Sequence, residues 1–345
     1  MQLTPFLACD RINIMNKLLK IIPKFKKIRI LVVGDLILDE FIWGSVERIS
    51  PEAPVPVVRV KSQSFMPGGA SNVANNIRAL EADVFMVGVA GSDLYGDILR
   101  QQLQDRGINT DGLIIDGSRQ TTLKTRVIAH NQQVVRIDKE DSYHINSVIL
   151  KKISNYIIKK IPEVDAVIIE DYGKGVITPQ LLNSIVKEAK KRYKIVTIDP
   201  KEQHLSYYKK ATCITPNKDE LEKVTNIKIE DAVSLKKAAN KILKKLELNS
   251  ILVTLGEDGM CLFEKSGKIT KIPTMAQEVY DVSGAGDTVI SVFTLALASN
   301  ASMKQAALIS NCAAGVVVGK VGVAVCLVDE LKNKIIEQDK EGAKK

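Results

Sequence analysis

The chain has 345 residues, 45% of them hydrophobic and 26% charged, and its formal net charge is +9. This composition is typical of a globular protein with a sizeable core and excludes a disordered chain. The lysines that carry most of the positive charge are scattered over expected helix faces without a nucleic-acid-binding motif, so we expect no nucleic-acid partner. No apolar run reaches the ~18 residues of a membrane span, and five dispersed cysteines favour a reducing cytoplasm.

Residues 1–24 precede the first expected strand and are interpreted as an N-terminal extension or a short docking helix. Buried strands are predicted at residues 28–33, 84–89, 166–170, 195–199, 213–215 and 250–255. Helices are predicted between them at residues 71–80, 97–106, 179–193 and 234–246. This alternation predicts an α/β fold with a doubly wound, mostly parallel sheet and helices on both faces. Ligands of such sheets bind beyond the carboxyl ends of the strands, and the polar residues that follow strands here are Asp35, Asp171, Asp199 and Asn217.

Two segments, 55–60 and 121–138, have the pattern of β structure without crossover helices. The second is expected to form a hairpin around Asn131 and Gln132. Because exposed strands need cover, we expect a small β-sheet lid over the cleft, and a homodimer formed through it. The predicted organisation is one domain over 25–335, whose lid comes from about 40–66 and 118–140, followed by a charged tail at 336–345.

A glycine turn at residues 281–288 leads into an apolar helix. Glycines permit close approach of a ligand, and the free N–H groups and dipole of a helix N-terminus attract anions. Asp287 lies inside this anion hole, an arrangement that suits phosphoryl transfer to a hydroxyl whose proton the carboxylate accepts. The alternative is a turn before a buried helix with Asp287 as a first-turn cap, and these residues alone do not separate the two.

Two further motifs open helices. Gly68 and Gly69 would let a ligand touch the backbone, and Asn72 would offer an amide to a sugar hydroxyl, although Ser71 or Asn72 could instead be a helix N-cap. Asn217 and Glu220, three residues apart after a strand, suit a Mg²⁺ that is held with substrate phosphates. The same pair also fits a capping box, and the two interpretations are compatible.

Other charged residues are candidates for contacts with an anionic sugar. Asp39 lies four residues after Asp35, at the end of the first strand and turn, where it could grip two sugar hydroxyls. Arginine recognises phosphate through a planar fork, and surface charge is the alternative for each basic side chain. The basic candidates for phosphate contacts are Arg126, Arg136, Lys174 and Lys201.

The order of these motifs resembles the ribokinase-like (PfkB) family of sugar kinases over residues 28–330. The resemblance rests on the Gly34-Asp35 strand end, Gly68-Gly69, Asn217-x-x-Glu220 and the 284–287 turn. Within that family the chain is more similar to the D-glycero-β-D-manno-heptose 7-phosphate kinases, which in many bacteria form the N-terminal half of a bifunctional protein. The residues that carry this narrower resemblance are 48–57, 67–70, 124–126, 132–133, 136–138, 171–175, 278–289 and 313–320.

The resemblance implies a ribokinase-like fold with ATP and Mg²⁺ as cofactors. It implies phosphorylation of the heptose 7-phosphate at its anomeric hydroxyl, in ADP-heptose and lipopolysaccharide core synthesis. The implied catalytic residues are Asp287 as base and Gly284, Ala285 and Gly286 as anion hole. The implied nucleotide-binding residues are Asn217, Lys218, Asp219, Glu220 and Gly256, with Glu220 also holding Mg²⁺ through water. The implied substrate-binding residues are Asp39, Gly68, Gly69, Asn72, Arg126, Arg136, Asp171 and Lys174.

The sequence departs from the family pattern in two places. Residues 202–205 replace the usual glycine-containing loop, which leaves a nucleotide contact by Lys201 open, and residues 322–325 lack the usual threonine. The chain ends at residue 345 without a histidine-bearing nucleotidyltransferase motif, so we expect a stand-alone kinase and a separate adenylyltransferase. The alternatives are another sugar specificity, such as ribose or fructose phosphate, and a non-catalytic sugar-binding protein, which the intact Asp287 disfavours.

Overall fold

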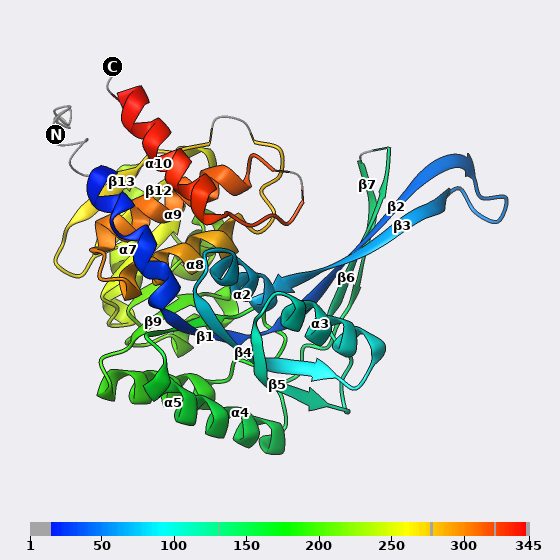
Figure 1. Cartoon of the computed structure of the whole chain (residues 1–345), viewed down its shortest axis with the longest axis horizontal. Coiled ribbons are helices and arrows are strands. Elements are labelled where there is room, and N and C mark those ends of the chain that lie inside the picture. Colours follow the sequence, from blue (N-terminus) through cyan, green and yellow to red (C-terminus); the bar gives the residue numbers. More distant parts are fainter. Residues whose placement is uncertain (1–14, 131, 277–278, 321, 343–345) are drawn as a thin grey trace.

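The computed structural model describes residues 15–130, 132–276, 279–320 and 322–342 (Figure 1). Among these residues the main sheet has nine strands in the order β13-β12-β11-β10-β9-β8-β1-β4-β5. All neighbours from β11 to β5 are parallel, and β12 and β13 extend one edge in antiparallel fashion. The strands are β1 (Arg29–Gly34), β4 (Asp83–Gly91), β5 (Asn109–Asp116), β8 (Ala166–Glu170), β9 (Ile195–Asp199), β10 (Cys213–Ile214), β11 (Ser250–Thr254), β12 (Met260–Glu264) and β13 (Ile269–Ile272).

Helices cover both faces of this sheet, which explains why its strands read as unbroken apolar runs. In β1, Ile30 and Val32 face one hydrophobic cluster, while Leu31 and Val33 face the other. The first cluster is formed with α2 (Ala70–Ala79), α3 (Leu94–Asp105), α8 (Ala285–Ala298), α9 (Met303–Val317) and α10 (Val328–Gly342). The second is formed with α4 (Ser147–Lys160), α5 (Pro179–Lys191), α6 (Lys218–Thr225) and α7 (Ala232–Lys245), and Figure 1 shows α4 and α5 on the opposite side of the sheet from α2 and α8.

The predicted doubly wound α/β fold is confirmed. Strands β8 and β9 match the prediction residue for residue, and the other predicted strands and the helices differ by a few residues at their ends. The prediction missed α4, α9 and α10, the parallel strand β5 and the antiparallel edge strands, whereas the helix expected after residue 217 is present as α6. In the described part of the chain, no helix is both long and apolar enough to cross a bilayer.

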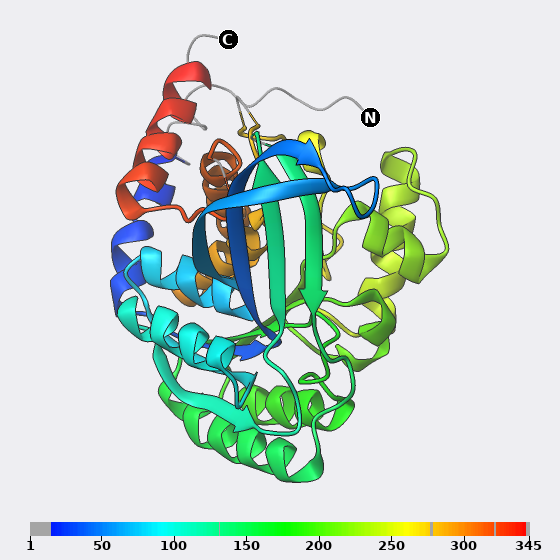
Figure 2. The ribbon, with the colours of Figure 1, turned by 90° about the vertical axis from the view of Figure 1, so that its right-hand side faces the viewer.

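A second sheet forms the lid, with strand order β3-β2-β6-β7. Its strands are β2 (Leu36–Ile49), β3 (Pro56–Gly69), β6 (Leu123–Ala129) and β7 (Gln132–Lys139). The expected hairpin is present as the antiparallel pair β6–β7, although Asn131 lies outside the described residues. The interpretation of Asp39 as the end of a strand and turn was wrong, because β2 continues through it for another ten residues, to Ile49. The lid projects from the body in Figure 1, and Figure 2 shows its strands side by side.

The segment before β1 packs on the body of the molecule. Residues 15–19 are helical, and a 3₁₀ helix follows at Ile22–Lys27. Leu18, Ile22 and Phe25 are buried in the first hydrophobic cluster. This agrees with the docking-helix interpretation for residues 15–24, while residues 1–14 lie outside the described part of the chain.

Candidate active site

The glycine turn at 281–288 forms the start of α8, as the sequence predicted. Gly284 is the N-cap residue, and its φ of 78° lies in the left-handed region that favours glycine. The next two residues, Ala285 and Gly286, begin the helix. The Ala285 N–H donates to the Val282 carbonyl at 3.2 Å, and the Gly286 N–H points out of the helix N-terminus without an intrahelical partner. A Cβ added at Gly286 would meet no atom of the described residues within 4 Å, so a ligand can approach this backbone closely.

Asp287 follows in the first turn of α8 and is 94% buried, with 6% of its surface exposed. The side-chain amide of Asn72 donates to Oδ2 at 2.6 Å, and the hydroxyl of Tyr172 donates to Oδ1 at 2.9 Å. Burial raises the pKa of Asp287 to about 6, against the lowering effect of these two donors. A carboxylate with a pKa near 6 is ionised at neutral pH yet basic enough to accept a proton from a bound hydroxyl.

Asn72 comes from α2, which packs against α8. Asn76, one turn later, donates to the backbone oxygen of Asn72 at 3.0 Å and accepts from the Thr288 hydroxyl at 2.9 Å. These bonds fix the two helices against each other and hold the Asn72 amide toward Asp287. The alternative that Ser71 or Asn72 caps α2 was wrong, because the N-cap residue is Gly69.

Tyr172, which the sequence analysis did not select, lies in the loop after β8. The buried carboxylate of Asp35 holds this loop by accepting the backbone N–H groups of Tyr172 at 2.9 Å, Lys174 at 3.0 Å and Val176 at 3.1 Å. Burial raises the pKa of Asp35 to about 6 despite these bonds. Asp35 therefore positions Tyr172, although the two are distant in sequence. Only the adjacency of Tyr172 to Asp171 could have suggested a role for it.

The predicted sugar contacts Asp39, Gly68, Gly69 and Asn72 lie together where the lid meets the body. Asp39 of β2 is paired in register with Met66 of β3, and Gly68 and Gly69 end that strand just before α2. A Cβ added at Gly68 would overlap Oδ2 of Asp39, so only glycine leaves this carboxylate in place. Arg126 of β6 donates to Oδ1 of Asp39. Burial raises the pKa of Asp39, and the Arg126 charge opposes this rise.

Three other predicted substrate contacts have protein partners in this structure. The Lys174 ammonium lies 2.6 Å from Oε1 of Glu140. Arg136 is on the exposed strand β7 and pairs with Asp138 at 2.9 Å. Asp171 accepts the Tyr208 hydroxyl at 2.8 Å and the Gly173 N–H at 2.9 Å, and its Oδ2 also lies 2.8 Å from Nδ1 of His204. These contacts show that Asp171 holds its own loop in place. A substrate contact by Lys174, Arg136 or Asp171 stays a prediction.

The predicted nucleotide motif opens α6 beside the carboxyl end of β11. Asn217 accepts the Glu220 N–H at 2.9 Å, and Glu220 accepts the Asn217 N–H at 2.9 Å. The capping-box interpretation is therefore confirmed. Lys218, Asp219 and Gly256 are exposed to solvent and Glu220 is half-buried, so all of them remain accessible to a ligand.

Three carboxylates meet beside the α8 N-terminus. One oxygen each from Glu170, Asp199 and Asp287 lies within 4.8 Å of the other two. Glu170 is fully buried, and neither of its oxygens has a hydrogen-bond partner among the described residues. Burial and the like charges of Asp199 and Asp287 raise the pKa of Glu170 well above its usual range. Oxygen-rich, anionic sites of this kind fit a hard cation such as Mg²⁺. The sequence analysis missed Glu170, although a carboxylate at the end of a buried strand was its signal.

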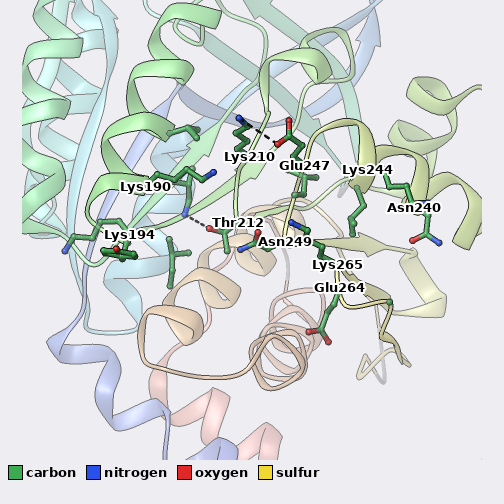
Figure 3. Close-up of a pocket in the computed structure, with 17 residues that line it drawn as sticks. Lys190, Lys194, Lys210, Thr212, Asn240, Lys244, Glu247, Asn249, Glu264 and Lys265 are labelled. Carbon is green, nitrogen blue, oxygen red and sulfur yellow. Dashed lines mark hydrogen bonds and ion pairs between the residues drawn. The ribbon is translucent and has the colours of Figure 1, made fainter.

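A separate cavity of about 1030 Å³ lies at the amino ends of the strands, opposite the carboxyl ends that carry Glu170 and Asp199 (Figure 3). Its floor includes Ile195, Thr212 and Asn249, which lie at or just before the amino ends of β9, β10 and β11. Since ligands of parallel sheets bind at the carboxyl ends, this cavity is not part of the site around Asp287. Its basic lining residues are Lys190, Lys194, Lys210, Lys244 and Lys265.

The model of the pfkB family carbohydrate kinases matches residues 27–330. The chain belongs to this family. It is therefore a carbohydrate kinase, a phosphotransferase, and the PfkB resemblance of the sequence is confirmed. The chain is 48% identical over 314 residues to the bifunctional protein HldE of Desulfatibacillum aliphaticivorans, covering 91% of this chain and 64% of that protein. It is 47% identical to HldE of Helicobacter pylori strain J99, covering 88% of this chain and 65% of that protein.

Solved kinase structures share the fold of this PfkB chain. Phosphofructokinase-2 of Escherichia coli in complex with substrates and products has a TM-score of 0.75 at 19% identity, covering 90% of this chain and 99% of that one. Ribokinase of Arabidopsis thaliana with ribose and ATP has a TM-score of 0.69 at 19% identity, covering 90% and 98%. The chain spans less than two thirds of the length of these bifunctional relatives.

Proposed function

We propose that this carbohydrate kinase transfers the γ-phosphoryl group of ATP to the anomeric hydroxyl of D-glycero-β-D-manno-heptose 7-phosphate. The product is the 1,7-bisphosphate, a precursor of ADP-heptose and of the lipopolysaccharide core. The observation that carries the reaction type is the buried Asp287 at the open N-terminus of α8. The sugar specificity is supported by the similarity to HldE proteins and by the 48–57 and 124–138 segments of the lid.

In the proposed mechanism Asp287 accepts the proton of the sugar hydroxyl as the phosphoryl group arrives. Asn72 and Tyr172 each donate to one of its oxygens and so hold the carboxylate in one orientation. The N–H groups of residues 284–287 stabilise the negative charge on the phosphoryl oxygens. Mg²⁺, when bound, neutralises the phosphate oxygens of ATP, and Glu220 and the carboxylates around Asp287 are the residues that would hold it.

The sugar would lie between the lid and the α8 N-terminus. Asp39 and the Asn72 side chain are proposed to hold its hydroxyls, and the glycines at 68 and 69 to leave room for its ring. Arg126 lies beside Asp39, and Lys174 approaches from the loop after β8. These two cations, with Arg136 of the lid, are proposed to hold the 7-phosphate. ATP would bind on the other side of Asp287, along the 217–220 motif and Gly256.

The lid is also proposed to join two copies of the chain. Several of its apolar side chains are exposed, namely Trp43, Ile49, Val55, Val60, Val134, Val135 and Ile137. Exposed apolar side chains on a sheet with uncovered edges favour an interaction with another chain. A Val135→Asp/Ile137→Asp double variant is expected to change a dimer into a monomer in sedimentation experiments. Val233→Asp on α7, at a more exposed apolar side chain outside the lid, is the control and is expected to leave the dimer intact.

The decisive experiment is identification of the product by ³¹P NMR after incubation with ATP, Mg²⁺ and heptose 7-phosphate. Ribose and fructose 6-phosphate serve as competing acceptors at equal concentration. A new anomeric phosphate signal on the heptose supports the proposal. A clear preference for ribose or fructose 6-phosphate contradicts the heptose specificity and leaves the sugar-kinase assignment in place.

A further inference from the structure

We propose that Glu170 and Asp199 bind one divalent cation directly, with Asp287 closing the site, and that this cation binds to the protein without nucleotide. The proposal concerns the bare protein and does not depend on which sugar is phosphorylated. It differs from a magnesium ion held through water by Glu220, because Glu170 contributes a carboxylate oxygen of its own.

The fold brings the first two carboxylates together by strand register. Glu170 ends β8 and Asp199 ends β9, and the two residues are direct partners in this parallel pair. Partners in register point to the same face of a sheet. That face carries α8, since Ile168, two residues before Glu170, packs in the hydrophobic cluster that includes α8. Asp287 at the start of α8 therefore closes the third side.

Glu170 lacks the partners that a buried carboxylate needs. It is fully buried, and both of its oxygens are without a hydrogen-bond partner among the described residues. The strongest charges acting on it come from Asp199 and Asp287, then Asp171 and Glu220, all of the same sign. Buried polar groups are nearly always satisfied, and an unpaired buried charge strongly destabilises a fold. A cation among these oxygens supplies the missing partner, whereas the alternative is a permanently protonated Glu170.

The spacing of the oxygens favours the cation. The three carboxylate oxygens lie within 4.8 Å of one another. Two oxygens on opposite sides of one ion are separated by about 4.2 Å for Mg²⁺ and about 5 Å for Ca²⁺, and adjacent ligands lie closer. Small side-chain shifts therefore suffice to bring all three onto one ion. Protonated carboxylic acids would instead share short hydrogen bonds, and none links these three groups among the described residues.

The surroundings orient the ligands and leave a way in. The Thr215 hydroxyl donates to Oδ1 of Asp199 at 2.8 Å, and Asn72 and Tyr172 hold Asp287. Such outer hydrogen bonds fix the ligands of a metal site. Asp199 is half-exposed, so an ion can enter from solvent on its side.

The test is a titration of the protein with Mn²⁺ followed by electron paramagnetic resonance, with neither nucleotide nor sugar present. Wild-type protein is expected to bind one Mn²⁺, and Glu170→Gln is expected to bind it at least tenfold more weakly. Asp199→Asn, a second variant of the site, is expected to behave in the same way. Glu188→Gln on α5 removes a carboxylate that is ion-paired with Arg192 and lies outside the carboxylate cluster, and it is expected to bind Mn²⁺ like the wild type.

Thermal unfolding provides a second readout that needs no activity. Saturating Mn²⁺ is expected to raise the Tm of the wild type and of Glu188→Gln, but not of Glu170→Gln. Without metal, Glu170→Gln is expected to melt close to the wild type, because the amide has the same shape as the carboxyl group that it replaces. Wild-type protein that binds no Mn²⁺ up to millimolar concentration, or Glu170→Gln that binds within twofold of wild type, would overturn the proposal. No sugar enters either measurement, so the proposed specificity and the cation site stand or fall separately.

Discussion

Replacing Asp287 by asparagine removes a single proton-accepting oxygen while keeping the shape of the side chain. In the structure this carboxylate is 94% buried and holds one donor on each oxygen, Asn72 at 2.6 Å and Tyr172 at 2.9 Å. The N–H groups at the start of α8 do not depend on the residue 287 side chain. The substitution therefore separates the general base from the anion hole.

The expected loss in turnover is about 10²–10⁴-fold, the usual contribution of a general base. This corresponds to about 3–5.5 kcal/mol in the activation barrier. Because the sugar and ATP contacts remain, KM is expected to change far less than kcat. A coupled assay of ADP release, at saturating ATP and Mg²⁺, measures both constants, and circular dichroism establishes that the variant is folded. A folded Asp287→Asn enzyme with near-wild-type kcat would refute the assignment of Asp287 as the base.

The same variant tests the electrostatics of the site. Folding raises the pKa of Asp287 from 3.8 to about 6, so the folded state disfavours the ionised carboxylate. Below about pH 4 this carboxyl group is protonated in both states and does not oppose folding. As pH rises toward 6 the unfolded chain ionises first, so the free energy of unfolding falls. At pH 8 in a chelator the ionised Asp287 should therefore cost the folded protein about 3 kcal/mol. Asp287→Asn is expected to be at least as stable there as the wild type, and a large fall in Tm would contradict this account.

Three other perturbations follow from the same geometry. The kcat of the wild type is expected to fall as pH drops below about 6, where Asp287 becomes protonated. Tyr172→Phe removes one donor to this carboxylate and should move the acidic limb of the pH profile up by about one pH unit. A pH profile of kcat that does not shift in this variant would count against the hydrogen bond. Gly68→Ala is expected to raise the KM for the sugar phosphate at least tenfold, because the new methyl group displaces Asp39, and to leave the KM for ATP near its original value. Initial rates measured with each substrate varied in turn give both constants. Equal changes in the two KM values would refute this role of Gly68. Glu220→Gln is expected to keep the stability of α6, since glutamine also serves in a capping box. The concentration of Mg²⁺ needed for half-maximal activity is expected to rise several-fold. An unaltered Mg²⁺ dependence would exclude Glu220 from the metal site.

The sequence by itself determined the class of fold and the principal chemistry. Strands β8 and β9 are continuous apolar runs because both of their faces are covered, and this pattern is visible without coordinates. The turn around Gly284 and Gly286 ahead of an apolar helix likewise fitted an anion site with a carboxylate inside it, and the other motifs of the chain favoured this over a helix cap. Both signals are local, since each depends on residues that are neighbours along the chain.

Long-range pairing was not accessible in the same way. β2 alternates too weakly for its 14 residues to be recognised as one strand, and its register with β3 depends on partners up to 33 residues away. The prediction therefore placed Asp39 at a turn, whereas the sheet places it inside a strand facing Arg126. The tertiary structure also chose Gly69 over Ser71 and Asn72 as the cap of α2, which freed the Asn72 amide for Asp287.

The neighbours of Asp287 were decided only by the tertiary structure. Asn72 is 215 residues from it along the chain and Tyr172 is 115 residues away, yet both donate to its carboxylate. Glu170 reads as the unremarkable end of a strand until the register with β9 sets it beside Asp199, under the start of α8. A local pattern can reveal a base and an anion hole, because both lie in one turn of chain. The pKa of that base and its access to a cation depend on burial and on charges from distant segments, and folding alone brings those together.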